Sequence, residues 1–403
     1  MTERRIITLA SRPAQPLTRA ALATPPQLAL YIHFPWCVRK CPYCDFNSHA
    51  VREEGIPEAA YVDALLADVE AALPQVWGRK VHTIFIGGGT PSLISPEGLE
   101  RLLTGVRMRL PLAPDCEITL EANPGTVEAD HFPGFRAAGV TRLSIGIQSF
   151  DDVMLQRIGR VHGAAEARRA AELAGRHFET FNLDLMYALP GQTLEQAMQD
   201  IETALEFAPP HLSCYHLTME PNTAFGAHPP ADLPDEDHSA DMQEAIEARL
   251  AEAGYQHYET SAFARPGHRC RHNLNYWRFG DYLGVGAGAH SKLSSHEGIR
   301  REMRHKHPGA YLTGAADGKF VQEWQEVGTE ALPFEFMMNA LRLTEGVPIS
   351  LFTERTGLSL AAIEPRLVAA RREGLLETDG EILRPTPHGQ RFLNTLLERF
   401  LEE

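Results

Sequence analysis

The chain has 403 residues, 43% of them hydrophobic and 23% charged, and a formal net charge of −15. This length predicts two or three domains, and the composition is that of an ordinary globular protein. The acidic balance disfavours nucleic acid as a partner, because a negatively charged protein repels phosphate backbones. No apolar run is long enough for a transmembrane helix, and the first 27 residues lack the apolar core of a secretory signal. Six cysteines, three of them clustered, favour a reducing cytoplasm.

Residues 1–27 are rich in Pro, Ala and Arg without a clear period and predict an N-terminal arm. From residue 28, short apolar runs alternate with longer amphipathic stretches. The expected strands cover 28–34, 81–87, 116–122, 142–149, 180–189 and 211–219, and the expected helices cover 57–74, 96–109, 129–138, 151–175 and 194–206. Strands that alternate with helices predict βαβ units and a parallel sheet. An α/β fold with an open (β/α)6 TIM-like partial barrel over 28–222 fits this pattern, and so does a doubly wound sheet.

The alternation ends near residue 222. Residues 223–327 contain a Pro-rich linker, an expected helix at 238–253, an expected edge strand at 255–263 and the unusual stretch CRHNLNYWRFGDYLGVGAGAHS. The basic run RREMRHKHP is interpreted as a solvated face. Residues 328–403 predict three helices with a short hairpin at 377–385, which suggests a mostly helical, winged-helix-like domain. Since no helix there is clearly rich in Lys and Arg, we expect a packing or lid domain rather than a DNA-binding one.

The most informative stretch is YIHFPWCVRKCPYCDF, which places Cys37, Cys41 and Cys44 at C-x3-C-x2-C spacing just after the first expected strand. Cysteine thiolate is the usual iron ligand in iron–sulfur clusters, so three thiolates on a short loop can hold three corners of a cubane cluster. The fourth iron would keep an open position, as catalytic metal sites do. A zinc site is the alternative, but structural zinc usually needs four ligands, and the other cysteines are scattered.

Polar or glycine-rich residues also follow the later expected strands, where a parallel barrel binds its ligands. The GGGTPS motif, which contains Gly88, Gly89 and Thr90, follows the second expected strand. Glycine lets a ligand approach the backbone closely, although a tight strand-to-helix turn explains the same residues. Glu121 and Asp184 stand in otherwise apolar runs. A buried carboxylate needs a partner, so each predicts either a salt bridge inside the barrel or a bound ligand.

A second cluster, HNLNYW at 272–277, combines a histidine with aromatic side chains. Imidazole can be an axial ligand of heme iron, and aromatic rings can cover a flat porphyrin. The alternative is an aromatic cluster that packs a domain junction around a hydrogen-bonded His272. His33 and His290 are further candidate ligands. The glycine-rich stretch at 284–291 could let the backbone wrap a cofactor.

The cysteine spacing, with Tyr43 before the last cysteine, and the flanking YIHFPWC resemble the radical S-adenosylmethionine (SAM) superfamily. The branch it resembles contains oxygen-independent coproporphyrinogen III oxidase and related heme chaperones. The resemblance favours the partial barrel and implies a [4Fe–4S] cluster whose open iron chelates the amine and carboxylate of SAM. Arg160 would suit bidentate pairing with that carboxylate. Besides the glycine motif, the resemblance implies a set of SAM contacts: Tyr31, Tyr43, Glu121, Gln148, Arg160, Asp184 and Thr218.

Within this branch, His272, Asn273, Tyr276 and Trp277 match the HNxxYW motif of the heme chaperones. The oxidases carry a fourth cysteine two residues after the third, where this chain has Phe46. The resemblance, which covers about 28–403, therefore favours a protein that binds heme and transfers it to an acceptor protein, with an electron donor for the cluster. The alternative is an enzyme that oxidatively decarboxylates porphyrinogen propionates. We expect a cytoplasmic location, and a peripheral association with the membrane stays open.

Overall fold

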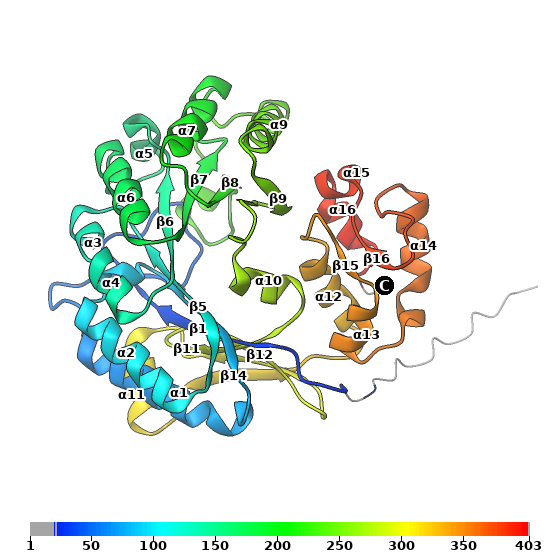
Figure 1. Ribbon diagram of the computed structural model, residues 1–403, viewed down its shortest axis with the longest axis horizontal. Helices are drawn as coiled ribbons and strands as arrows, with labels where there is room; N and C mark the ends of the chain where they lie inside the picture. The colour runs from blue at the N-terminus through cyan, green and yellow to red at the C-terminus, as the bar shows by residue number, and fades with distance from the viewer. Residues whose placement is uncertain (1–19, 21, 402–403) are drawn as a thin grey trace, which may run out of the picture.

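The computed structural model describes residues 20 and 22–401, so the arm expected at 1–27 lies largely outside the described residues. Parallel strands form the centre of the molecule, and their hydrogen-bonded order follows their order in the chain (Figure 1). Sequential order is that of a barrel, whereas a doubly wound sheet reverses direction at its middle. The partial barrel is thus confirmed. Its strands are β1 (Leu28–Phe34), β4 (Val81–Gly88), β5 (Leu112–Ala122), β6 (Arg142–Gln148), β7 (Thr180–Tyr187) and β8 (His211–His216).

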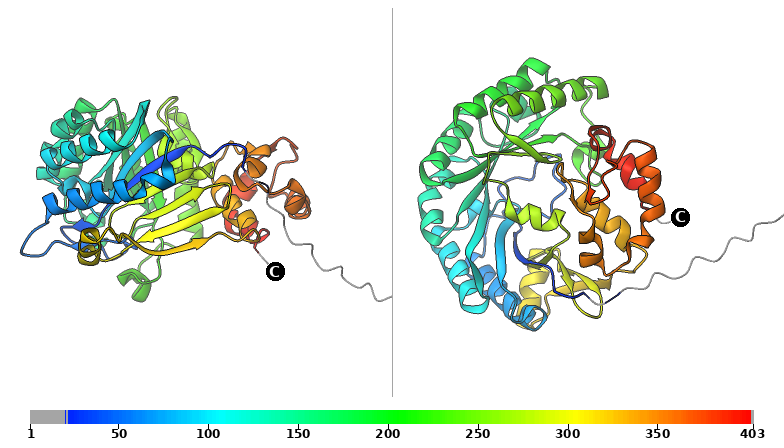
Figure 2. Two further views of the ribbon diagram at one scale, coloured as in Figure 1. Left: turned by 90° about the horizontal axis from the view of Figure 1, so that it is seen from below. Right: turned by 45° about the vertical axis from the view of Figure 1, so that its right-hand side comes forward.

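Helices cover the outer face of this curved sheet (Figure 2). In the first of them, Tyr61, Leu65 and Val69 are buried at helical spacing, which explains why the amphipathic pattern predicted it. The helix expected at 129–138 is divided where Pro133 begins a new first turn. The helix expected at 151–175 is divided around Gly159, whose φ is +72°. The helices are α1 (Glu58–Val76), α2 (Pro96–Arg109), α3 (Thr126–Asp130), α4 (Phe132–Ala138), α5 (Asp152–Arg157), α6 (Ala164–His177) and α7 (Leu194–Glu206).

Both edges of the parallel sheet are extended by strands from the middle of the chain. At one edge, the segment expected as a single strand at 255–263 forms β9 (Gln256–Glu259) and β10 (Ala262–Ala264), with β10 antiparallel to β8. At the other edge, β11 (Asp281–Val285) runs parallel to β1. It is followed by antiparallel β12 (His290–Ser294), β13 (Ile299–Arg304) and β14 (Val321–Glu326). These four strands were not predicted, because glycines and charged residues interrupt their apolar pattern.

The expectation that RREMRHKHP forms a solvated face is wrong for its central residues. The run lies largely in β13, where Arg304 is only 1% exposed. The Arg304 guanidinium donates to Asp68 of α1 at 3.0 Å and to Glu302 at 2.9 Å. Tyr311 of α11 (Pro308–Ala316) also donates to Asp68, at 2.9 Å. A buried charge persists when it is paired, and this network fastens the added strands to the first barrel helix.

The C-terminal domain has its own apolar core, which includes Phe336, Phe352, Leu367 and Phe400. It is mostly helical, as expected, and carries a small sheet of β15 (Val347–Pro348) and β16 (Ile382–Leu383). The turn expected at 377–385 does close on itself through Glu377 N and Arg384 O, at 3.0 Å. The helices are α12 (Leu332–Ala340), α13 (Ser350–Thr356), which was not predicted, α14 (Glu364–Arg372), α15 (Pro387–Arg391) and α16 (Leu393–Glu398).

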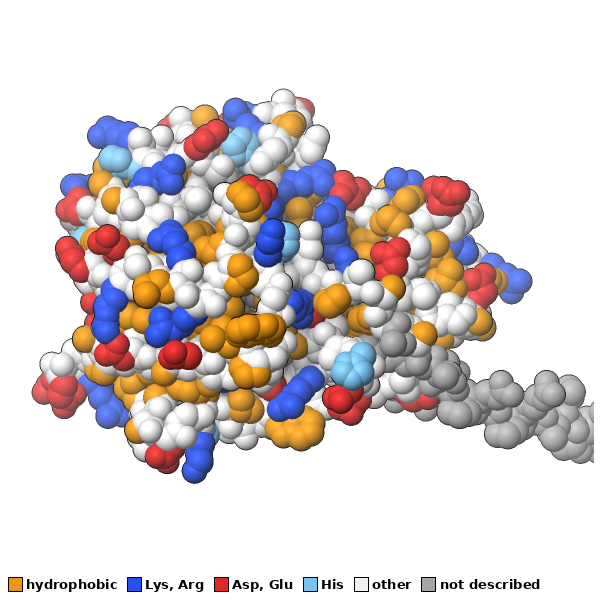
Figure 3. All heavy atoms as spheres, turned by 60° about the horizontal axis from the view of Figure 1, so that its bottom comes forward, with side chains coloured by type: hydrophobic (Ala, Val, Ile, Leu, Met, Phe, Trp, Pro, Cys, Tyr) orange, Lys and Arg blue, Asp and Glu red, His pale blue; other side chains and the backbone are white. Residues whose placement is uncertain are grey.

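Two short helices and one long helix lie between these parts: α8 (Ala224–Ala227), α9 (Glu236–Glu252) and α10 (Arg271–Trp277). The last of these lies between the barrel and α12, as the right-hand view of Figure 2 shows. No helix in the described part of the chain is long and apolar enough to cross a membrane. On the face drawn in Figure 3, Lys and Arg side chains are interspersed with Asp and Glu, so this face shows no basic stripe.

Candidate functional site

The three clustered cysteines lie on the loop that follows β1, at the carboxyl edge of the sheet. Short strands β2 (Trp36–Cys37) and β3 (His49–Ala50) pair with each other and close this loop. Arg39 donates to Gly159 O at 2.7 Å, which ties the loop to the turn after α5. Cys37, Cys41 and Cys44 all line one cavity of about 150 Å³, together with the glycine motif and most of the predicted rim residues. The structure therefore brings together the cysteines, the glycine motif and most of the rim residues that the sequence predicted to lie at one edge of the sheet.

The glycine motif packs tightly against the cysteine loop. Gly89 N donates to Phe34 O and Thr90 N to Trp36 O, each at 2.7 Å. A Cβ atom at Gly89 would clash with the backbone carbonyl of Trp36, and Gly88 has a φ of +118° with the His33 ring against it. Close packing and a left-handed backbone both require glycine here. The tight-turn explanation of the motif therefore holds, and the same residues also line the cysteine cavity.

Glu121 and Asp184 face the inside of the barrel without an ion-pair partner among the described residues. Glu121 accepts a hydrogen bond from Gly88 N at 3.0 Å. Burial raises its pKa to about 8, and the nearby Asp184 adds to the rise. Asp184 accepts from Ser144 at 3.1 Å and from Asn182 at 2.8 Å, and burial raises its pKa as well. The predicted salt bridge inside the barrel is absent at both carboxyls, which leaves them available to a ligand that carries positive charge.

Arg160 brings positive charge to the same cavity. Its guanidinium donates to Asn123 Oδ1 at 2.6 Å and to Gly146 O at 2.8 Å, and it lies 3.6 Å from Cys41 Sγ. The Nε atom is buried without a hydrogen-bond partner. Burial raises the pKa of Tyr43, whose hydroxyl lies near Arg160. Of the three clustered thiols, Arg160 contacts Cys41 alone, and burial raises the pKa of the other two cysteine thiols, Cys37 and Cys44. A guanidinium in this cavity suits a carboxylate ligand.

The remaining predicted SAM contacts divide between cavities. Gln148 ends β6 with a φ of +69°, a strained conformation that often marks a functional position, and it lines the cysteine cavity. Thr218 is exposed and donates to Glu220 at 2.8 Å, and it lines a neighbouring cavity of about 410 Å³ inside the barrel. Tyr31 lines a third, larger cavity and donates or accepts a 3.0 Å hydrogen bond with His33. The structure thus places Tyr31 and Thr218 outside the smallest cavity.

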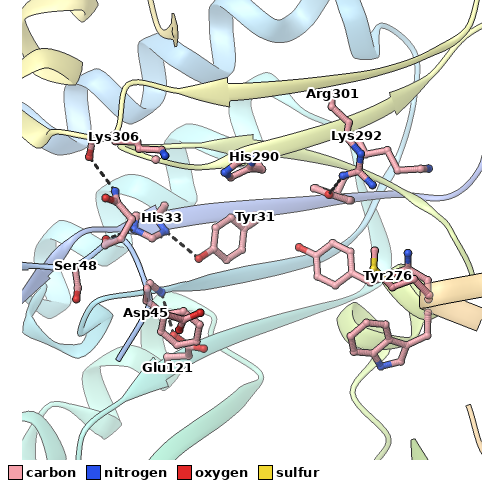
Figure 4. A pocket seen from close by; sticks show the side chains of 18 of the residues that line it. Tyr31, His33, Asp45, Ser48, Glu121, Tyr276, His290, Lys292, Arg301 and Lys306 are labelled. Carbon is pink, nitrogen blue, oxygen red and sulfur yellow. Dashed lines mark hydrogen bonds between the residues drawn. The ribbon is translucent and has the colours of Figure 1, made fainter. Parts of the chain in front are cut away.

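The largest cavity has a volume of about 780 Å³ and opens beside the cysteine loop (Figure 4). Ligand pockets commonly measure about 300–1,000 Å³. Its walls come from β1, β11, β12 and β13, from the end of α10 and from α12. Phe46, which stands where the related oxidases have a cysteine, is 58% exposed and lines this cavity and both others. All three cavities therefore meet at the cysteine loop.

The HNLNYW motif forms α10 and is shared between two cavities. Tyr276 and Trp277 line the large cavity, whereas Asn273 lines the one inside the barrel. His272 is 1% exposed and lines neither of them. Its Nδ1 is 2.9 Å from Thr83 Oγ1, and its Nε2 is 2.9 Å from the Tyr276 hydroxyl. Burial lowers the pKa of His272 to about 3, so the ring is neutral with both nitrogens engaged.

The glycine-rich stretch at 284–291 packs tightly against neighbouring segments, and Gly288 and His290 within it line the large cavity. A Cβ atom at Gly286 would clash with His33 O, and one at Gly288 would clash with Asn47. Both glycines have positive φ angles. The motif GVGAGAHS therefore ends β11 and turns the chain into β12, against β1 and the loop after the cysteines. Sequence reasoning missed several residues of the large-cavity wall, which belong to unpredicted strands and to α12: Tyr282, Lys292, Arg301 and Met338.

Comparison with known proteins identifies this arrangement. The family model described as the radical SAM superfamily matches residues 31–204, and the HemN C-terminal domain matches residues 329–392. The heme chaperone HemW of Escherichia coli (strain K12) is 52% identical over 94% of this chain and 99% of its own length. The Haemophilus influenzae heme chaperone HemW is 50% identical over the same shares. The Bacillus subtilis protein of that name is 35% identical over 93% of this chain and 99% of its own.

Among solved structures, the coproporphyrinogen III oxidase HemN of Escherichia coli, a radical SAM enzyme, shares the fold. It aligns over 93% of this chain and 90% of its own with a TM-score of 0.78 and 24% identity. The fold and the cysteine loop thus define a radical SAM protein. Within that superfamily, the chain belongs to the HemW family.

The residues of the cysteine cavity fit the cofactors that the superfamily implies, a [4Fe–4S] cluster and SAM. Three thiols, a guanidinium and two carboxyls line one space. In residues 20 and 22–401, no three His, Cys, Asp or Glu side chains converge closely enough to hold a single metal ion. A cubane cluster does not need that convergence, because each thiolate binds a different iron. The zinc alternative gains no support from this geometry.

Proposed function

We propose that this protein binds heme and transfers it to an acceptor protein, and that it carries a [4Fe–4S] cluster with SAM at the open iron. The observation that carries the proposal is the 780 Å³ cavity, which Tyr276 and Trp277 of HNLNYW line on one side and the cysteine loop on the other. The relatives that cover almost the whole chain are named heme chaperones. A porphyrin bound there would lie beside the cluster loop.

Cys37, Cys41 and Cys44 would ligate three irons of the cluster. Bound SAM supplies a methionyl amine, a carboxylate and a sulfonium to this site. Arg160 lines the same cavity and would meet the carboxylate, since a guanidinium suits carboxylate geometry. Glu121 and Asp184 would face the positive charge, and Gln148 and Tyr43 would complete the rim. These roles follow from placement and charge.

The heme-binding part would use the aromatic wall. Tyr276 is held in place by its hydrogen bond to His272 at 2.9 Å. Trp277 has the Arg342 guanidinium 4.3 Å from its ring centroid, which stabilises one face of the indole. Because these contacts hold the Tyr276 and Trp277 rings in place, the rings present a preorganised apolar surface, which reduces the entropy lost when a flat ligand binds. The acceptor protein and the electron donor are further parts of this proposal. We also propose a cytoplasmic protein, with peripheral contact to the membrane where the acceptor lies in one.

The experiment uses the full chain with its cluster reconstituted anaerobically. Ferric heme is titrated by difference absorbance, and we expect saturation at one heme per chain. The heme-loaded protein is then mixed with apomyoglobin, and we expect the heme spectrum to move to the globin. Absence of stoichiometric binding would contradict the proposal.

A second arm tests the alternative enzyme activity. The reconstituted protein is incubated with SAM, a reductant and coproporphyrinogen III without oxygen. We expect no release of CO2. Product formation would instead favour oxidative decarboxylation of porphyrinogen propionates.

A further inference from the structure

The large cavity contains an imidazole that the HNLNYW motif does not supply. His290 begins β12 and lines the cavity together with Lys292 two residues later, as expected for one face of a strand. In the view of Figure 4, His290 lies between Lys306 and Lys292, above the Tyr31 ring. Its side chain is exposed to the cavity, and its ring has no hydrogen bond among the described residues. A histidine that is unpartnered and faces a cavity can accept an incoming ligand.

Three other histidines lie in this region. His49 also lines the cavity, but its Nε2 is buried, without a hydrogen-bond partner among the described residues, so the ring would have to move before that nitrogen could bind iron. His33 and His272 are engaged in hydrogen bonds. His33 is within 3.0 Å of the Tyr31 hydroxyl through Nδ1 and within 2.8 Å of Asn47 O through Nε2. His272 is bonded through both nitrogens and has no access to the cavity. Each would have to break a buried hydrogen bond before it could bind iron, which costs about 1–3 kcal/mol for the group left behind.

The position of His290 is set by the sheet. Its backbone pairs with Met303 of β13, and a Cβ atom at Gly284 of β11 would clash with its carbonyl group. These contacts hold the first residue of β12 against both neighbouring strands. The imidazole therefore extends from a rigid element, which a metal ligand requires if its geometry is to be kept.

The cations around the cavity fall into two groups. Arg301 is paired with Glu335 at 2.6 Å, and Lys292 is paired at 3.2 Å with Asp281, which also pairs with Arg79 at 2.9 Å. Lys306 and Lys40 also line the cavity, and neither forms an ion pair in residues 20 and 22–401. Unpaired ammonium groups suit the two carboxylates of a porphyrin. Phe46 offers an exposed apolar ring to the same space.

We infer that His290, and not His272, supplies the protein ligand to heme iron in this cavity, with Lys306 beside the propionates. The inference rests on the proposed function and deepens it, because it assigns an axial ligand and a charge partner to the heme site. His272 has a different role, since its hydrogen bond holds Tyr276 in the cavity wall. Met338 of α12, which is 41% exposed and lines the cavity, stands on the domain across from β12.

The test compares single variants in the full chain with its cluster reconstituted. His290→Ala removes the inferred ligand, and His296→Ala is the matched control, because His296 follows on the same hairpin and its side chain is 84% exposed. Ferric heme titrations should show affinity lowered by about tenfold or more for His290→Ala, with a change of the absorbance spectrum, and no change for His296→Ala. Added imidazole should restore the wild-type spectrum to His290→Ala.

A charge variant tests the second half of the inference. Lys306→Glu should weaken heme binding and leave the spectrum of the bound heme unchanged, because the axial ligand remains. Lys319→Glu is its control, since that lysine is 78% exposed and does not line the cavity. Unchanged affinity in Lys306→Glu would remove Lys306 from the heme site.

The outcomes separate this inference from the proposed function. If wild-type protein does not bind heme, the proposed function fails. If wild-type protein binds heme and His290→Ala keeps both its affinity and its spectrum, only the inference fails. Loss of the heme spectrum in a His272→Ala protein that folds and retains its cluster, with recovery of the spectrum on addition of imidazole, would also overturn the inference, since it would identify His272 as the ligand.

Discussion

Two adjacent regions of the molecule differ in how their polar residues are arranged. One is the cysteine rim, formed by the residues at the carboxyl ends of the parallel strands. The other is the wall of the large cavity, formed by the segment from α10 to β13. On the rim, side chains follow parallel strands in chain order, and Cys37, Gly89 and Gln148 meet because every strand ends at the same edge. On the wall, the strands are mostly antiparallel, and His272 and His290 differ completely in partners and access. A motif residue, His272, can therefore hold a cavity-lining side chain in place, while a residue outside the motif, His290, lines the cavity itself.

The largest expected effect concerns the rim. Replacing Cys37, Cys41 or Cys44 singly by Ala should abolish incorporation of the [4Fe–4S] cluster, because thiolates are its ligands. Iron content and the visible absorbance of the anaerobically reconstituted protein measure this. Cys116→Ala is the control, since Cys116 lies in β5 and lines none of the three cavities. A full cluster in all three rim variants would contradict the ligand assignment.

The next effect tests how firmly the wall is joined to the rim. Arg304→Ala leaves Asp68 buried without its cation and leaves Glu302 paired with Arg300 alone, and breaking a buried pair costs about 3–5 kcal/mol of unfolding free energy. Arg101→Ala is the matched control, because its pair with Asp63 is exposed and should contribute at most about 1 kcal/mol. Urea unfolding followed by circular dichroism compares them. Equal losses in both variants would show that the network does not fasten the added strands.

The two histidines should also differ in stability. His272→Ala leaves the hydroxyl groups of Thr83 and Tyr276 without partners, which costs about 1–3 kcal/mol. His290→Ala removes an exposed ring with no hydrogen bond and should change the unfolding free energy by at most about 0.5 kcal/mol. Thermal and urea midpoints of the heme-free proteins give the comparison. A larger loss for His290→Ala would reverse the roles assigned to the two rings.

The sequence predicted the rim because local pattern and chain order suffice there. Six apolar runs separated by amphipathic helices define the parallel strands, and the rule that ligands bind at strand ends places Glu121 and Gln148. Neither signal exists for the wall. The pairing of Arg304 with Asp68 joins residues far apart in the chain, so a charged strand such as β13 looks like a solvated face until its partner is known.

The same limit applies to the candidate heme ligands. The sequence pointed first to His272, through the HNxxYW motif, with His33 and His290 as further candidates, and residue type alone could not test that order. Their ranking depends on which ring nitrogens are already bonded, a property of the folded neighbours: Thr83 on β4 for His272 and Asn47 after the cysteine loop for His33. Phe46 was noticed as a missing cysteine, whereas its exposure between three cavities follows only from the structure.

The smallest expected effect is a change of SAM affinity with pH, caused by titration of Glu121 on the rim. Burial raises the pKa of Glu121 to about 8, so in the ligand-free protein the carboxyl is mostly protonated at neutral pH. A positively charged ligand favours the carboxylate, and the proton must leave before it binds. The affinity for SAM should therefore increase with pH up to the raised pKa, by about tenfold between about pH 7 and pH 9.

Isothermal titration calorimetry of the cluster-loaded protein measures this dependence, with Glu121→Gln as the control. The amide keeps the shape of the side chain but does not titrate, so its SAM affinity should lack the component that Glu121 contributes. Any dependence that both proteins share belongs to SAM itself or to the cluster, and only the difference reports on Glu121. If the two proteins gave parallel pH profiles, the Glu121 carboxyl would carry its proton unchanged through SAM binding, and Asp184 would be the rim carboxyl that faces the ligand's positive charge.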